Sequence, residues 1–131
     1  MTPRTAPAFK GKTFGTILLV LAQLAIGIIH SLFGGIAVLA RIDYYNIYTF
    51  VFGIAVLTLT RGLCNGTNLG KIGTIIVSAF VATADLLTIL DMPSIPGIPK
   101  FATYFETIYS IIVIAYLLQT YKTRIPENQN K

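Results

Sequence analysis

The stretch FGTILLVLAQLAIGIIHSLFGGIAVLA, residues 14–40, decides the fold class of this chain. It contains no formally charged side chain, and it exceeds the roughly 20 apolar residues with which a helix crosses a bilayer. Its apolar part is far longer than the core of a secretory signal, and no A-x-A cleavage motif follows it. The stretch therefore predicts a membrane-spanning helix.

The composition of the whole chain agrees with a membrane protein. The 131 residues are 54% hydrophobic and only 11% charged, whereas a soluble domain has about 25% charged residues. The net charge is +5, but the basic residues lie between long apolar runs, which excludes the clustered basic face of a nucleic-acid binder. The single cysteine, Cys64, excludes an intrachain disulfide and a four-cysteine metal site.

Three further apolar runs follow the first one. The breaks between them carry turn residues, among them the Asn- and Gly-rich segment 64–70 and the proline-rich segment 91–100. We therefore predict an all-α membrane protein, a bundle of four transmembrane helices that forms a single membrane domain, residues 1–131. The predicted segments are the tail 1–13, the spans 14–40, 44–63, 71–90 and 101–121, and the tail 122–131.

The lysines and arginines predict the orientation of these spans. Eight of the ten lie in the two tails and at the ends of the second and third spans that border their connection, where Arg61 and Lys71 stand. Because cytoplasmic segments carry the excess of Lys and Arg, we predict a multi-pass protein of the cell membrane with both termini cytoplasmic. The two that lie in the other connections are Arg41 and Lys100.

Apart from Arg61 and Lys71 at the span ends, three residues with His, Asp or Glu side chains lie within the predicted spans: His30, Asp85 and Glu106. With a helical rise of 1.5 Å per residue, they lie roughly 24, 22 and 21 Å above the cytoplasmic side of a ~30 Å hydrocarbon core. A charge in hydrocarbon costs on the order of 3 kcal/mol or more, so such groups usually face the interior and pair. We predict one buried polar layer in which His30 and Asp85 interact.

Two functions are open for this layer. One imidazole and two carboxylates could carry protons or bind a metal, as in non-haem iron sites. Alternatively, the same residues lock the packing of the helices or contact a partner subunit. We favour the structural role, because no local H-x-x-E or H-x-x-x-H motif accompanies the three residues. We predict no catalytic set, no metal site and no cofactor.

Small residues on the first span form a possible packing face. Gly27, Ser31 and Gly35 recur at four-residue spacing, which places them on one side of a helix. Only small side chains allow two helix backbones to approach closely in a membrane. We predict that this row contacts a neighbouring helix, either inside the bundle or on another chain.

Residues 14–124 resemble small four-span membrane proteins of unassigned function that are common in archaea. The resemblance rests on Gly62-Leu63, which precede the turn Asn65-Gly66, and on Tyr116-Leu117 before the basic Lys122. The chain is also similar, more distantly, to the small accessory subunits of archaeal ammonia monooxygenase. That similarity implies an accessory subunit of a membrane enzyme complex.

The sequence favours a non-catalytic integral membrane subunit that packs against larger membrane partners, because it has neither a catalytic set nor a sizeable soluble domain. The expected contacts are the lipid bilayer and either larger subunits or further copies of the chain, with no nucleic acid. The alternative is a small oligomeric transporter or channel that uses His30, Asp85 and Glu106. A third class, an enzyme with a metal in that layer, also stays open.

Overall fold

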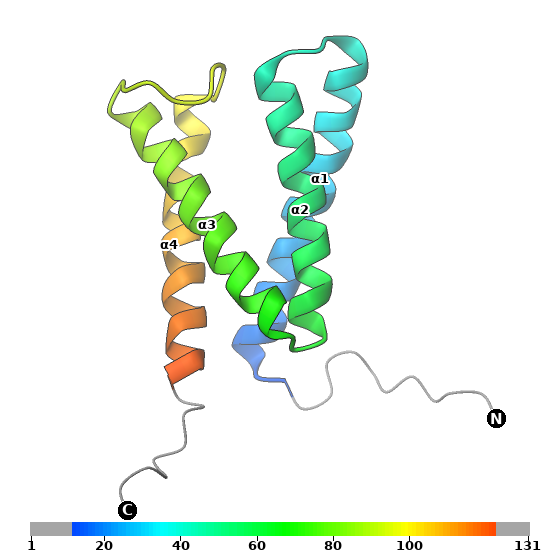
Figure 1. Cartoon of the computed structure of the whole chain (residues 1–131), viewed down its shortest axis with the longest axis vertical. Helices are drawn as coiled ribbons and strands as arrows, with labels where there is room; N and C mark the ends of the chain where they lie inside the picture. Colours follow the sequence, from blue (N-terminus) through cyan, green and yellow to red (C-terminus); the bar gives the residue numbers. More distant parts are fainter. Residues whose placement is uncertain (1–11, 123–131) are drawn as a thin grey trace, which may run out of the picture. The chain divides into compact units, whose positions relative to one another are not determined.

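Four helices follow one another in the computed structural model of the chain: α1 (Phe14–Ala40), α2 (Tyr44–Cys64), α3 (Asn68–Ile89) and α4 (Lys100–Lys122) (Figure 1). The structure describes residues 12–122, and no strand occurs in that range. By length and composition, each helix can cross a membrane. The predicted all-α fold of four membrane-spanning helices is therefore confirmed.

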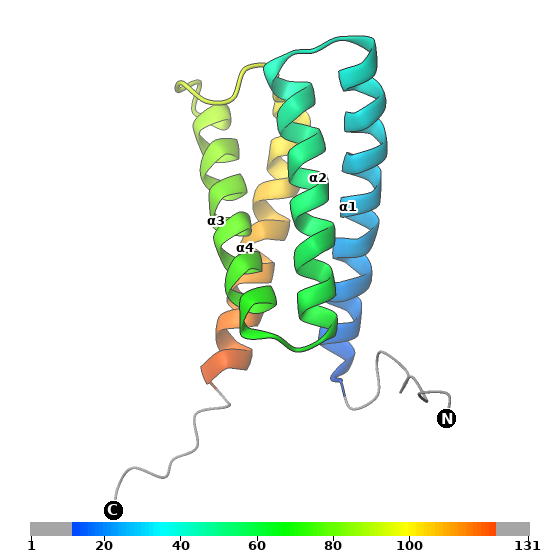
Figure 2. The ribbon, with the colours of Figure 1, turned by 45° about the vertical axis from the view of Figure 1, so that its right-hand side comes forward.

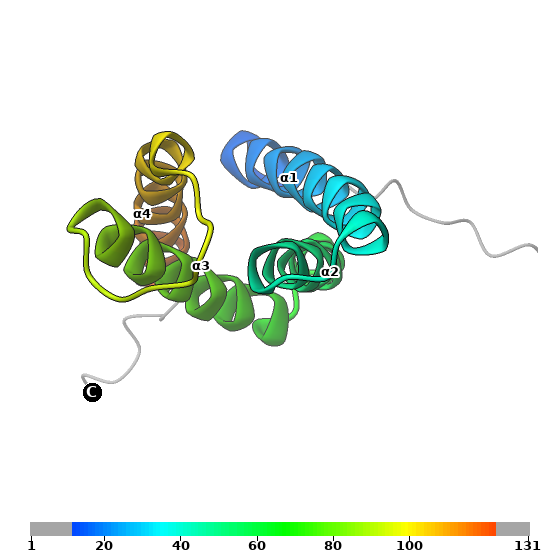
Figure 3. The ribbon, with the colours of Figure 1, turned by 90° about the horizontal axis from the view of Figure 1, so that it is seen from above.

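The helices belong to two compact units, one that ends at Thr74 and one that begins at Ile75. In the first unit, α1 and α2 lie side by side and antiparallel (Figure 2). In the second unit, α4 returns antiparallel to residues 75–89 of α3. The connection of residues 90–99 arches between their ends (Figure 3).

The turn between α1 and α2 is held by the side chains of Asp43 and Asn46. Asp43 caps α2, since its Oδ1 accepts a hydrogen bond from the Asn46 N–H at 2.9 Å. The Asn46 side-chain amide donates to the carbonyls of Arg41 at 2.8 Å and Ala37 at 3.3 Å. The amide thereby gives the carbonyl of Arg41 a partner, and it adds a second hydrogen bond to the carbonyl of Ala37, which already accepts from the Arg41 N–H at 2.8 Å.

Close backbone contact joins α1 to α2 at two glycines. A Cβ atom added to Gly34 would lie 2.6 Å from the backbone nitrogen of Phe50. A Cβ atom added to Gly53 would lie 2.6 Å from the Oγ of Ser31 and 2.8 Å from the carbonyl carbon of His30. These separations leave no room for a side chain, so the two helix backbones approach each other directly.

Helix α3 begins at Asn68 and not at Lys71, where the sequence predicted it, because Thr67 caps it. The Oγ1 of Thr67 accepts a hydrogen bond from the Gly70 N–H at 3.1 Å. The preceding Gly66 has a positive φ of 68°, the left-handed conformation that glycine adopts readily after a helix.

The C-terminal end of α3 uses the same type of turn with a different residue. Asp91 has a φ of 55°, and its N–H donates to the carbonyl of Thr88 at 3.3 Å. The next N–H, of Met92, donates to the carbonyl of Leu87 at 2.8 Å. This pair of hydrogen bonds is the Schellman arrangement that ends many helices. Asp91 also forms an ion pair with Lys100, the first residue of α4.

Threonine hydroxyls along the helices donate to the carbonyl four residues earlier in the same helix, at 2.7 to 2.9 Å. Such a bond gives the hydroxyl a partner that hydrocarbon cannot supply. With this internal hydrogen bond, a threonine can face either lipid or a neighbouring helix. The residues are Thr49, Thr58, Thr60, Thr74, Thr83, Thr88 and Thr120.

The adjacent glycines 34 and 35 provide a test of the α1–α2 contact. We expect Gly34→Ala to destabilise the protein by about 1–3 kcal/mol, because its Cβ meets the backbone of α2. Gly35→Ala should be neutral or stabilising, since its Cβ meets only the Phe50 ring at 3.3 Å and alanine favours the helix by about 1 kcal/mol. Thermal unfolding in mild detergent measures both. Equal melting temperatures for the two variants would contradict the contact.

Candidate functional site

The three ionisable residues of the predicted layer lie in different units. His30 lies on α1 in the first unit, whereas Asp85 on α3 and Glu106 on α4 belong to the second. Within the second unit, the charge of Glu106 acts on Asp85, so two carboxyl groups lie close enough to interact. The interaction of His30 with Asp85 stays a prediction.

The His30 ring is oriented by α1 and α2 together. Its Nδ1 lies 2.8 Å from the carbonyl oxygen of Ile26, and since a carbonyl only accepts, this Nδ1 bears the proton. The ring also contacts Phe52 edge-on, with 5.1 Å between centroids and 81° between planes. The fixed tautomer makes Nε2 the nitrogen with acceptor capacity in the neutral ring.

A buried amide joins α1 to α2 about two helical turns before His30 in the sequence of α1. The Gln23 side chain is buried, and its Oε1 accepts a hydrogen bond of 3.4 Å from the hydroxyl of Thr60. That hydroxyl also donates to the carbonyl of Val56 in its own helix at 2.7 Å. The long interhelical bond is therefore the weaker of the two.

The small residues of the predicted packing row lie near α2. A Cβ atom added to Gly27 would lie 2.8 Å from the side chain of Leu57, and Ser31 borders Gly53. Gly35 borders only the Phe50 ring. The backbone contact at this height is made by the neighbouring Gly34.

Asp85 is the most unusual polar residue of the second unit. Its side chain is 0% exposed, and neither carboxylate oxygen has a hydrogen-bond partner among residues 12–122. Burying a polar group without such a partner costs free energy, and for a carboxylate the cost is large. The site therefore calls for a compensating group at Asp85.

Hydroxyl side chains line the buried face of α4. Thr103, Thr107 and Ser110 are buried, and their spacing of four and three residues places them on one side of the helix. Thr103 donates to the carbonyl of Lys100. The Oγ1 of Thr107 is buried and has no hydrogen-bond partner among the residues that the structure describes.

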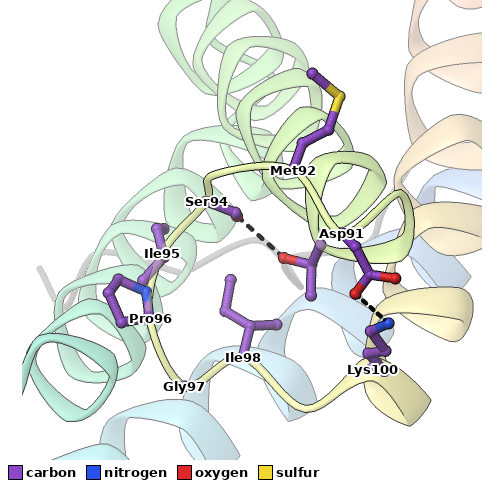
Figure 4. A pocket seen from close by; sticks show the side chains of 9 residues that line it. Asp91, Met92, Ser94, Ile95, Pro96, Gly97, Ile98 and Lys100 are labelled. Atoms are coloured by element: carbon purple, nitrogen blue, oxygen red, sulfur yellow. Dashed lines mark hydrogen bonds and ion pairs between the residues drawn. The ribbon is translucent and has the colours of Figure 1, made fainter.

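The connection between α3 and α4 folds back over the end of α3 (Figure 4). The Ser94 hydroxyl donates to the carbonyl of Ala84 at 2.9 Å and accepts from the hydroxyl of Thr88 at 3.0 Å. A hollow of about 300 Å³ lies beneath this connection, with the Asp91–Lys100 ion pair at its edge. Ser94 thereby brings the connection to the residue that precedes Asp85.

An apolar hollow of about 270 Å³ lies on the second unit, among residues of α3 and α4 that are in part exposed. Several residues of α3 and one residue of α4 line it, and the small side chains of Ala82 and Thr83 leave space in it. The hydroxyl of Thr83 donates to the carbonyl of Ala79 at 2.8 Å, so it presents mainly its methyl group. The lining residues are Ala82, Thr83, Leu86, Leu87, Leu90 and Ile111.

No group of three or more His, Cys, Asp or Glu side chains that could hold a metal ion occurs within residues 12–122. Within the second unit, Asp85 and Glu106 offer carboxylate oxygens, and buried hydroxyl groups lie on α4. Such a donor set suits hard cations, which prefer oxygen ligands.

Sequence reasoning did not single out the hydroxyl face of α4 or Ser94. The four- and three-residue spacing of Thr103, Thr107 and Ser110 is a helical period, so the face could have been found beside Glu106. Ser94 offers no such signal, because its role depends on how a proline-rich connection folds. No protein-family model, curated protein or solved structure matches this chain.

The bond between Gln23 and Thr60 leads to a prediction. We expect Gln23→Met, which keeps the size and removes the amide, to change stability by less than about 1 kcal/mol, as is typical of interhelical hydrogen bonds in membranes. Thr60 retains its bond to Val56 in the variant. Unfolding in mixed detergents measures the change. A loss of folding would show that the amide does more than this contact.

Proposed function

We propose that the chain is a non-catalytic integral membrane subunit that packs against larger membrane partners. The observation that carries the proposal is the apolar hollow among residues of α3 and α4. The small side chains of Ala82 and Thr83 leave room for a bulky apolar side chain from a neighbouring helix, because small residues permit close approach in a membrane.

The first unit supports the same conclusion by how it uses its small residues. Gly27 and Gly34 already lie against α2, and Ser31 borders Gly53. Most of the small residues of α1 named here therefore already contact α2 of the same chain. A partner helix is expected instead at the second unit, where Ala79 and Thr83 lie on the exposed side of α3.

The more distant similarity of the chain to the small accessory subunits of archaeal ammonia monooxygenase suggests the kind of assembly. We propose, as the finer hypothesis, that the partners are the larger subunits of a complex of the archaeal ammonia monooxygenase type. The chain would contribute helices and an outward surface to that assembly. The chemistry of the complex would reside in the other subunits.

A second candidate function is a small oligomeric transporter or channel that uses the His30, Asp85 and Glu106 layer. The specific observation in its favour is the buried Asp85 carboxylate, because ionisable residues inside a membrane commonly mark ion or proton pathways. The two functions differ in what accompanies the chain. A subunit requires other proteins, and a transporter requires only copies of itself.

Two exposed threonines give a matched test of the partner surface. Thr83 and Thr58 both donate to their own helices, but only Thr83 lines the hollow. After purification from the native membrane in mild detergent, Thr83→Leu should retain several-fold less of the larger membrane proteins than the wild type. Thr58→Leu should retain them fully. A chain that purifies alone and conducts ions in vesicles would instead support the second candidate.

The orientation in the membrane is a separate prediction of this proposal. In a Cys64→Ser background, Thr5→Cys and Asn128→Cys should react with a membrane-impermeant maleimide only after the cells are permeabilised, because the Lys and Arg count places both tails in the cytoplasm. Pro96→Cys, in the α3–α4 connection, serves as the control and should react in intact cells. Labelling of either tail in intact cells would reverse the proposed topology.

A further inference from the structure

Asp85 needs a compensating group that the described residues do not supply. Both of its carboxylate oxygens are buried and have no hydrogen-bond partner in residues 12–122. Lys100, the basic residue at this end of the second unit, forms its ion pair with Asp91. The negative charge of Glu106 acts on the same carboxyl group and makes its surroundings more favourable to a cation.

A second observation points to a ligand at the same level of the second unit. The Oγ1 of Thr107 is also buried without a hydrogen-bond partner among the described residues, and Thr107 is 8% exposed. Asp85 lies about 6 Å before the end of α3, and Thr107 about 10 Å after the start of α4, by the helical rise. The two helices are antiparallel, so the two residues lie at similar depths in the second unit.

We propose that Asp85 and Thr107 bind a small monovalent metal cation, Na⁺, between α3 and α4. A carboxylate, a hydroxyl and helix carbonyls are the hard oxygen ligands that such an ion takes. A divalent ion of the Ca²⁺ type needs six to eight oxygens and commonly several carboxylates, whereas one charge suffices to compensate Asp85. The site goes beyond the proposed subunit role and does not depend on it.

The bound ion would explain how a carboxylate stays buried in a membrane-spanning hairpin. It would join α3 to α4 near the connection that Ser94 anchors to the carbonyl of Ala84. Ser94 places the connection beside Ala84, the residue before Asp85, which fits the complete burial of Asp85. Sodium would then act as a structural ligand that favours the folded hairpin over its opened forms.

Thermal unfolding of the purified full-length protein tests the proposal. In sodium chloride the melting temperature should exceed that in choline chloride of equal ionic strength by several degrees, and the rise should saturate with sodium concentration. The rise should disappear in Asp85→Asn and persist in Asp91→Asn, whose carboxyl group is exposed in the wild type. Thr107→Val should lose much of it, and Thr103→Val should keep it.

The comparison of salts in the wild type needs no variant, so it decides the matter even where Asp85→Asn fails to fold. Equal melting in sodium and choline would overturn the cation site. A sodium effect that survives in Asp85→Asn would place the ion elsewhere and overturn the assignment as well. Neither result affects the comparison of the Thr83→Leu variant with the wild type in retaining partner proteins. The subunit role is therefore tested separately.

Discussion

Hydrocarbon offers no hydrogen-bond partners, and most features of this chain follow from that constraint. The threonine hydroxyls turn back to the carbonyls of their own helices, and the His30 Nδ1 does the same toward Ile26. Gln23 finds its partner on the next helix, at Thr60. These polar side chains are thereby satisfied at short range, which lets the helices stay long and apolar while they carry polar residues. Against this background, the buried carboxyl group of Asp85 is an exception that calls for a ligand.

The same constraint shapes the packing of the helices. No hydrophobic force drives helices together inside a bilayer, so association depends on close fit. The contact of α1 with α2 achieves this at Gly34 and Gly53, where backbone lies against backbone. The second unit differs, because its buried faces carry hydroxyl groups and Asp85, and an apolar hollow lies among residues of α3 and α4. In the first unit, the close contacts therefore join α1 to α2. The second unit carries the surface proposed for a partner and the site proposed for a cation.

The fold class could be predicted from the sequence because the apolar length of each run and the turn residues between the runs are local properties. The same holds for the start of α2, where Asp43 supplies the cap. The start of α3 was predicted too late, because capping by Thr67 depends on the left-handed Gly66 before it. Only part of the candidate site could be predicted from the sequence. Helical rise gives the depth of a residue but not its rotation about the axis, so Asp85 could be found from its charge while the buried hydroxyl of Thr107 was missed.

The proposed cation site requires that the Asp85 carboxyl group is ionised and bound to a cation. Infrared difference spectroscopy on the detergent-solubilised protein tests this directly when sodium is exchanged for choline. The account predicts a change in a carboxylate stretching band that is present in the wild type and absent from Asp85→Asn. A carboxylate spectrum that is identical in the two salts would contradict it.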